Sequence, residues 1–165
     1  MPQPLPEQTI ADAITRVAAL AAELPCVVVL HDLRDWQVAW MSPRGLTELG
    51  LTIEEITALT AEEYYSRYFN GEDAKDYVPK ILGLLEQNND GNICTFFQQV
   101  RFRVNEDWKW HMASTRIFAH DTDGKPLLTI TMAFPIASMH HMSLKASRLL
   151  EEITFSVKTC TFLLK

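Results

Sequence analysis

The histidines, cysteines and paired acids are the side chains in this sequence best suited to chemistry, but their spacing matches no common catalytic or metal site. Cys26, Cys94 and Cys160 are far apart, which excludes a disulfide framework and a zinc site. His140 and His141 are adjacent, and adjacent side chains rarely reach one metal ion, so a solvated linker explains them better. We therefore predict no metal ion.

His31 lies beside Asp32 and close to Asp35, which resembles a general acid–base pair. We interpret this segment as a turn instead, because aspartate favours turns by hydrogen bonding to its own backbone. Paired acids such as Glu54 and Glu55 are adjacent and diverge on a helix, so they indicate solvated faces. No glycine-rich phosphate loop is present. These observations predict no catalytic residues, and hence a protein that is not an enzyme.

The composition is that of one soluble globular domain. The chain has 165 residues, of which 47% are hydrophobic and 22% charged. Its net charge of −6 argues against nucleic-acid binding by this segment, since such binding needs a basic face. No apolar run approaches the ~18–20 residues of a membrane span, and residues 1–8 do not resemble a secretion signal. With the unpaired cysteines, this indicates a reduced, cytoplasmic setting and no membrane partner.

An amphipathic helix is predicted after a disordered, proline-rich lead. Thr9 and Asp12 resemble a capping box at its start, and Pro25 ends it. Its apolar stripe consists of Ile10, Ile14, Val17, Ala21 and Leu24. The stripe either packs on its own domain or forms the seam of a homodimer, because spacings of four and three also suit a short coiled coil. Two or three heptads are too few to decide between these interpretations.

Two strands and several helices are predicted next. Residues 26–30 and 36–41 form strands joined by a turn, and Ser42 caps a short helix that ends at Gly50. Two capping boxes then begin short helices; they pair Thr52 with Glu55 and Thr60 with Glu63. A longer helix covers residues 72–88, with Pro79 assigned to its first turns.

Three strands, at residues 93–104, 108–120 and 126–136, complete the pattern. The element order is helix, two strands, several helices and three strands. It predicts an α+β fold with a mostly antiparallel five-stranded sheet and helices on one face, plus a flanking N-terminal helix.

This order, together with several motifs, resembles the PAS domain. The motifs are residues 26–32 and 36–43, LTELGL at 46–51, the acidic helix start at 52–56, the aromatic-rich hairpin at 96–110 and DTDGKP at 121–126. The resemblance covers residues 25–136. It implies a flanking helix at 1–24, a PAS domain at 25–136 and a connector at 137–165. The chain departs from the family at Ser42, where many members have Asn, and in the FPI ending of the last strand at 134–136.

The segments 145–152 and 162–165 resemble the connector of bacterial PAS proteins that continue into a LuxR-type helix-turn-helix. This resemblance implies a sensory domain of a transcriptional regulator that dimerises and reaches DNA through a domain beyond residue 165. Two alternatives remain open. One is a dimerisation or interaction module that senses nothing. The other is a small cone-shaped α+β enzyme, which needs a buried Asp or His facing a deep cavity.

Two cofactors that some PAS proteins carry are not expected. Flavin photochemistry needs a reactive cysteine near the middle helices, and none lies between Cys26 and Cys94. Haem needs an axial ligand, usually a histidine on the long helix, and residues 72–88 contain none. We therefore expect no cofactor, so that any signal is an uncoloured small molecule or a protein contact.

The candidate ligand site is a cavity between the sheet and the helices. Gln98 is polar on an otherwise apolar strand face that also carries Val100. Met112 and Ser114 share a face of the next strand, and Met132 lies on the last. A mostly apolar pocket with a few polar groups suits a small molecule. The competing interpretation, which the sequence favours, is a filled core in which Gln98 bonds a neighbour or a water.

Overall fold

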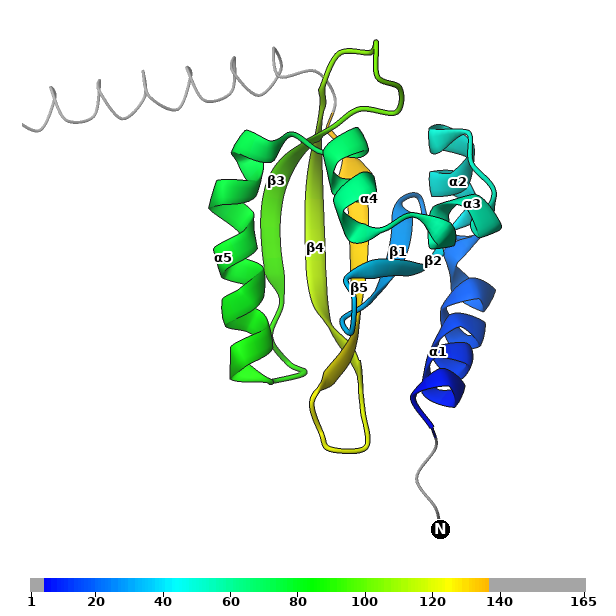
Figure 1. Cartoon of the computed structure of the whole chain (residues 1–165), viewed down its shortest axis with the longest axis vertical. Helices are drawn as coiled ribbons and strands as arrows, with labels where there is room; N and C mark the ends of the chain where they lie inside the picture. Colours follow the sequence, from blue (N-terminus) through cyan, green and yellow to red (C-terminus); the bar gives the residue numbers. More distant parts are fainter. Residues whose placement is uncertain (1–4, 137–165) are drawn as a thin grey trace, which may run out of the picture. The chain divides into compact units, whose positions relative to one another are not determined.

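The structure, a computed structural model, describes residues 5–136, whose strands form one five-stranded antiparallel sheet (Figure 1). The strands are β1 (Val27–Asp32), β2 (Gln37–Met41), β3 (Cys94–Val100), β4 (Lys109–His120) and β5 (Pro126–Pro135). Their order across the sheet is β2-β1-β5-β4-β3. The predicted α+β class and the antiparallel five-stranded sheet are confirmed.

The chain divides into two units, Met1–Pro135 and Ile136–Lys165, and only the first is considered below. The predicted connector at 137–165, with its LuxR-like segments and His140 and His141, lies outside the described residues.

The helices lie on both faces of the sheet. They are α1 (Pro6–Ala21), α2 (Pro43–Leu49), α3 (Ile53–Ala58), α4 (Ala61–Tyr68) and α5 (Gly71–Gln87). Side chains alternate along β1, so Val29 packs with Tyr64 of α4, while Val28 packs with Val17 of α1. The face under α4 and α5 is called the inner face below, and the face that carries α1 the outer face.

Helix α1 begins earlier than the capping pattern indicated. Pro6 occupies its first turn and Leu5 precedes it, while Thr9 donates its hydroxyl to the Leu5 carbonyl instead of capping. The predicted start at Thr9 is therefore wrong, because a proline at the first turn already favours the helix. Of the apolar stripe, Val17 and Ala21 are buried and Ile10 and Ile14 partly buried in the outer-face core, whereas Leu24 follows the helix and is exposed. The stripe is thus occupied by its own domain.

Local signals place most of the other helix ends correctly. Both capping boxes are present, from Thr52 to Glu55 and from Thr60 to Glu63, and Gly50 ends α2 with a φ of 69°.

Two local expectations are wrong. Ser42 precedes α2, but its hydroxyl caps no helical amide; it accepts a hydrogen bond from the Val28 N–H at 3.0 Å, which ties the start of α2 to β1. Pro79 lies in the middle of α5 and not in its first turns. It is exposed there, and the helix continues through it.

Strand β3 ends at Val100, four residues before the predicted end. After this residue the chain no longer pairs with β4 and bonds to the end of α4 instead. The Arg101 N–H donates to the Tyr68 carbonyl at 3.0 Å, and Phe69 forms an isolated bridge with Val100. Phe102 and Val104 consequently lie in the loop before β4 and do not extend the strand.

The junction of α4 and α5 is also bonded to the edge strand β3 through Gln99. The Asn70 N–H donates to the Gln99 carbonyl at 3.1 Å, and the Asn70 amide donates to the Gln99 side chain at 2.6 Å. In return, the Gln99 N–H donates to the Asp73 carboxylate at 2.8 Å. These three bonds, together with the Phe69–Val100 bridge, are called the β3 anchor below. They use backbone groups that an edge strand would otherwise leave unpaired.

We expect Asp73→Ala to lower the free energy of unfolding by about 1–3 kcal/mol, because it leaves the Gln99 N–H without its charged acceptor. Asp73→Asn keeps an acceptor oxygen and should lose less. The matched control is Asp76→Ala, which removes an exposed carboxylate from the same helix and should change stability by less than about 0.5 kcal/mol. Urea unfolding measures all three. Equal losses for Asp73→Ala and Asp76→Ala would contradict the anchor's role.

Candidate ligand-binding cavity

A cavity of about 770 Å³ lies between the inner face of the sheet and the helices above it. Its floor is made by alternate residues of the five strands, among them Val29, Gln98, Thr115 and Thr131, and its roof by residues of α4 and α5. The volume lies within the range of roughly 300–1,000 Å³ that is usual for small-molecule sites. The filled-core interpretation is therefore wrong, because native cores leave few voids larger than a water molecule.

Two of the five predicted pocket residues line the cavity and three do not. Gln98 and Val100 belong to its lining. Met112, Ser114 and Met132 project from the outer face, where Ser114 and Met132 are cross-strand partners. The placement of these three is wrong by one position, because alternation identifies two faces of a strand but not which face is covered. On β4 and β5 the inner residues of the lining are His111, Thr115, Thr129, Thr131 and Ala133.

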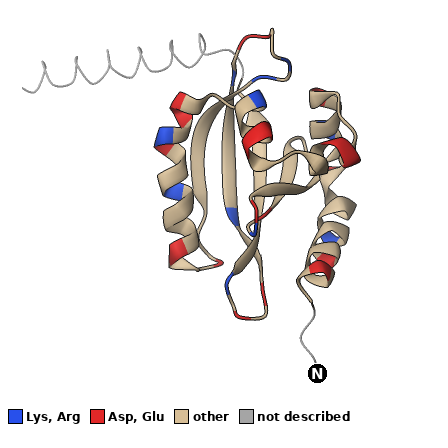
Figure 2. Cartoon of the chain, viewed as in Figure 1, with Lys and Arg blue, Asp and Glu red and all other residues tan. Residues whose placement is uncertain are grey.

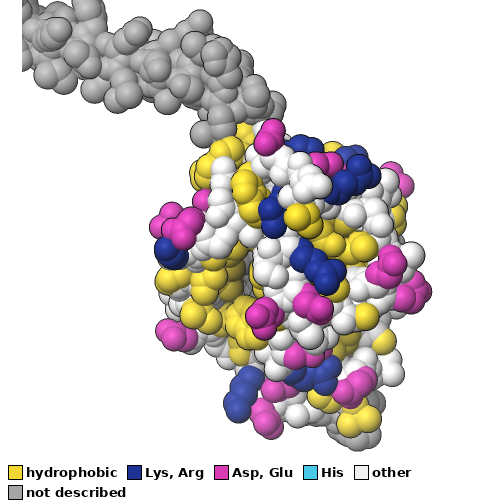
Figure 3. All heavy atoms as spheres, turned by 45° about the horizontal axis from the view of Figure 1, so that its top comes forward, with side chains coloured by type: hydrophobic (Ala, Val, Ile, Leu, Met, Phe, Trp, Pro, Cys, Tyr) yellow, Lys and Arg dark blue, Asp and Glu magenta, His cyan; other side chains and the backbone are white. Residues whose placement is uncertain are grey.

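The cavity opens to solvent beside α5. Val78 and Leu82 both line it, yet 41% and 44% of their surfaces are exposed. Figure 3 shows apolar side chains gathered at the surface around a hollow on this side of the domain. A small molecule can therefore reach the interior without separating the sheet from its helices.

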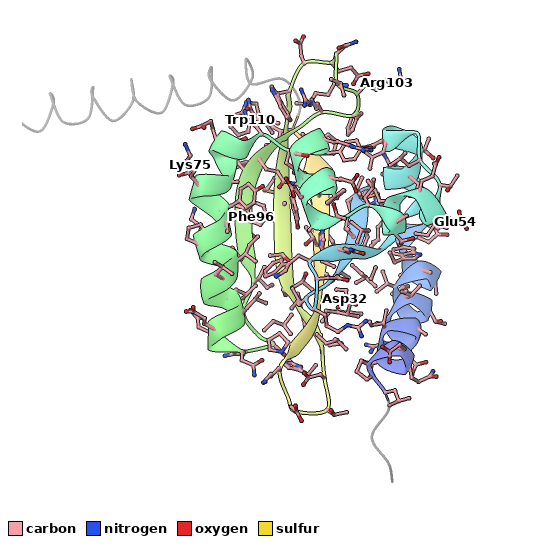
Figure 4. The ribbon with its side chains drawn as sticks, in the orientation of Figure 1. Asp32, Glu54, Lys75, Phe96, Arg103 and Trp110 are labelled. Atoms are coloured by element: carbon pink, nitrogen blue, oxygen red, sulfur yellow. The ribbon has the colours of Figure 1, made fainter. Side chains whose placement is uncertain are left out.

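Aromatic rings form two opposite walls. Tyr64, Tyr65, Tyr68 and Phe69 cluster at the end of α4, with ring centroids 5.2–5.8 Å apart. Across the cavity Tyr77 of α5 stacks on Phe96 of β3 at 4.7 Å, and Figure 4 shows Phe96 between these two elements. Burial raises the pKa of Tyr77 to about 12 and that of Tyr64 well above its usual value, so both phenols keep their protons.

A polar pair lies on the floor between these walls. Gln98 on β3 is directly opposite His111 on β4, and both side chains are buried. Nδ1 of His111 donates to the Lys109 carbonyl at 3.1 Å, and in the neutral tautomer that makes this bond Nε2 is an acceptor. The Gln98 amide takes part in no side-chain hydrogen bond within residues 5–136. The neighbouring Thr115 and Thr131, by contrast, bond each other at 2.9 Å.

His31 lies in β1 and lines the cavity, so its assignment to a turn is wrong. The turn begins at Leu33, and Asp32 points to the outer face, where it pairs with Arg34 at 2.6 Å. The His31 ring lies 6.1 Å and 6.3 Å from those of Tyr64 and Tyr65, and its Nε2 is buried with no hydrogen-bond partner in the described part of the chain. Burial lowers the pKa of His31 to about 4. Reading the alternation of β1 past residue 30 would have found it.

The charged residues that line the cavity are all acidic. They are Asp35, Glu48 and Glu62, and no Lys or Arg belongs to the lining in residues 5–136. Charged residues lie mainly on the helices and loops, and few are on the strands (Figure 2). Within residues 5–136 the lining therefore offers no Lys or Arg side chain to pair with a buried anion.

Solved structures similar to this chain include light-oxygen-voltage and PAS domains. A light-oxygen-voltage domain solved with a flavin analogue has a TM-score of 0.58 at 16% identity and covers 83% of this chain and 96% of its own. The N-terminal domain of a diguanylate cyclase with a PAS/PAC sensor, from Marinobacter aquaeolei, has a TM-score of 0.54 at 16% identity and covers 70% of this chain and 98% of its own. The PAS domain of an HTR-like protein from Haloarcula marismortui has a TM-score of 0.53 at 17% identity and covers 79% of this chain and 97% of its own.

The chain has the PAS fold. At these identities the likeness establishes the arrangement of strands and helices and nothing about ligands. In the sequence comparisons, no family model and no curated protein matches the chain. No helix among residues 5–136 is long and apolar enough to cross a membrane. Within the same residues, no group of three or more His, Cys, Asp or Glu side chains lies close enough to hold a metal ion.

Among residues 5–136, the lining of this PAS cavity contains no cysteine and no Lys or Arg. Neither Cys26 nor Cys94 belongs to it, so a cysteine–flavin adduct has no nucleophile there. The phosphate of flavin mononucleotide and the carboxylates of haem are anions, and among residues 5–136 the lining has three acids, two histidines and no Lys or Arg.

We expect the free energy of unfolding to fall as the pH drops from about 6.5 to 4, partly because of His31. The folded ring resists protonation while the unfolded ring accepts it, so acid favours unfolding by at most about 3 kcal/mol. Tyr64 and Tyr65, the titratable groups beside the ring, stay neutral over this range. Urea unfolding at several pH values should show a shallower decline for His31→Gln than for the unmutated protein.

The control for this measurement is His120→Gln. The His120 ring is partly exposed and bonds the Asn88 side chain at 2.8 Å. Because His31 is unchanged in this variant, its contribution to the fall of the unfolding free energy with decreasing pH should remain. A His31→Gln profile parallel to that of the unmutated protein would mean that His31 already titrates normally in the folded state.

Proposed function

We propose that this chain is the sensory PAS domain of a signalling protein, in which a small molecule enters the cavity and its binding is passed to an output domain. The observation that carries the proposal is the open cavity of about 770 Å³, whose apolar walls enclose a few polar groups; one of these, Nε2 of His31, is buried with no hydrogen-bond partner within residues 5–136. A binding site of this kind combines apolar lining with a few polar groups that orient the ligand.

The output in this proposal is transcriptional. It is supported by the resemblance of residues 145–152 and 162–165 to connectors that precede a LuxR-type helix-turn-helix. DNA would then be bound by a domain beyond residue 165, since the net charge of −6 makes this segment itself a poor nucleic-acid partner. A reduced, cytoplasmic setting agrees with this role.

An enzyme is less well supported, although the cavity contains two histidines. A general base is normally held by a hydrogen bond from a third group, often a carboxylate. His111 is bonded to a backbone carbonyl, and Nε2 of His31 has no partner within residues 5–136. The low pKa of His31 also makes it a weak base at neutral pH.

Signal transmission in this proposal runs through β3. Gln98 faces the cavity, while the next residue, Gln99, holds the β3 anchor. A ligand bonded to Gln98 therefore acts on the strand to which α4 and α5 are attached. Such a ligand shifts the domain between two states only if it binds them with different affinity.

The test is whether the purified protein carries or binds a small molecule. We expect native mass spectrometry to show an additional noncovalent mass, or a compound library to raise the melting temperature. Ala133→Phe, which fills the floor, should abolish either effect. Met132→Phe changes the adjacent outer-face residue and serves as control. If Ala133→Phe does not fold, Val78→Trp at the exposed entrance replaces it.

The proposal fails if the unmutated protein carries no additional mass and no compound stabilises it. It also fails if Ala133→Phe and Val78→Trp, both folded, bind the molecule as well as the unmutated protein does.

A second candidate function, a dimerisation module, is favoured by the outer face of β3, β4 and β5. Phe97, Met112 and Met132 are 51%, 36% and 37% exposed there, and cross-strand pairing makes them neighbours. An exposed apolar patch of this kind is typical of protein–protein contacts. The patch is distinct from the α1 stripe, whose buried residues Val17 and Ala21 pack within the domain.

If the patch forms a homodimer, Phe97→Ser should weaken it about tenfold or more, as loss of a central aromatic contact does. Val104→Ser removes an even more exposed apolar residue from the β3–β4 loop and should leave the dimer intact. Light scattering across a concentration series measures both. A protein that stays monomeric at every concentration contradicts this second function, while ligand binding is unaffected by it.

A further inference from the structure

The residues that line the cavity restrict the chemical class of ligand that it can bind. Resting on the proposed function, we propose that it binds an uncharged, planar aromatic compound whose hydrogen-bonding edge, with a donor and an acceptor such as a carboxamide has, meets Gln98 and His111. Three independent features of the lining support this class.

The first feature is charge. Asp35, Glu48 and Glu62 line the cavity, and no Lys or Arg does so in the described part of the chain. An anion placed inside would lose its water without gaining a counter-charge, which is strongly unfavourable. Burial raises the pKa of Tyr64 and Tyr77, so both phenols stay neutral and supply no charge. Carboxylates and phosphates are thereby selected against.

The second feature is the pair of aromatic walls. Phe96 and Val100 flank Gln98 on the inner face of β3; Phe96 stacks on Tyr77, and Val100 forms its bridge with Phe69 of the α4 cluster. A ligand over Gln98 therefore has rings on both sides. Planar aromatic molecules gain offset-stacked and edge-to-face contacts with such walls, beyond the area that they bury.

The third feature is the set of polar groups on the floor. Gln98 supplies one donor and one acceptor, and Nε2 of His111 supplies an acceptor opposite it. Nε2 of His31 is buried without a partner on the same inner face. Buried polar atoms are almost always satisfied, so the unpaired ones mark where a ligand's polar edge belongs.

Four probes of similar size separate these features. 2-Naphthamide has an aromatic ring system and a carboxamide, whereas 2-naphthoate has the same rings and a carboxylate. 2-Methylnaphthalene has the rings but no hydrogen-bonding group, and decanamide has the carboxamide but no ring. Calorimetry or thermal shift at neutral pH gives their relative affinities. We expect 2-naphthamide to bind at least about 100-fold more tightly than 2-naphthoate, and about tenfold more tightly than each of the other two.

Substitutions at Gln98 test whether this side chain binds the carboxamide of the ligand. Gln98→Leu should weaken 2-naphthamide about tenfold and leave 2-methylnaphthalene unchanged. The matched control is Thr95→Val, on the exposed face of the same strand, which should change neither. If Gln98→Leu unfolds the protein, Gln98→Glu replaces it, because a carboxylate keeps the shape of the side chain but removes its donor.

The outcomes distinguish this inference from the proposed function. Binding of 2-naphthoate or decanamide as tight as that of 2-naphthamide overturns the ligand class but leaves a ligand-binding sensor. The same holds if none of the probes binds while the purified protein carries another small molecule. If none of the probes binds, no molecule accompanies the protein and no library compound stabilises it, both proposals fail.

Discussion

The cavity depends on the β3 anchor, which fixes α4 and α5 to the edge of the sheet and not to its centre. The bonds among Asn70, Asp73 and Gln99 engage backbone groups of an edge strand, where no further strand competes for them. The two aromatic groups then keep the helices apart from the floor. The floor residues between them include Thr115, Thr131 and Ala133, which are too small to fill the remaining space. Anchoring at the edge with small residues at the centre is what leaves a hollow.

The parts of the fold that could be predicted are those set by local sequence. The capping boxes that begin α3 and α4 and the glycine that ends α2 depend on three or four consecutive residues, and all three were found. The wrong boundaries have tertiary causes. The β3 strand ends where Arg101 bonds α4, and the Ser42 hydroxyl bonds β1 across fourteen residues of sequence. Neither partner can be identified from neighbouring residues alone.

The site was predicted only in part for a related reason. Alternation on β3 identified Gln98 and Val100, because a single glutamine interrupts an otherwise apolar strand face there. On β4 and β5 the two faces are about equally apolar, because α1 and an exposed patch lie behind the sheet. Hydrophobicity then cannot choose the face, and a shift of one residue exchanged His111 for Met112. His31 was missed because its aspartate neighbours carried a stronger turn signal.

The same residues that make the cavity suitable for a ligand weaken the unliganded domain. A buried polar atom without a partner, such as Nε2 of His31, costs on the order of 1–3 kcal/mol, and an unfilled apolar space adds to this cost. A ligand that binds only the folded domain offsets such losses by an amount that grows with the logarithm of its concentration over its dissociation constant. In the proposed sensor, occupancy thus changes how firmly β3 and its anchored helices are held. In this proposal the signal is the difference in stability between the liganded and the unliganded domain, and no catalytic group is needed to produce it.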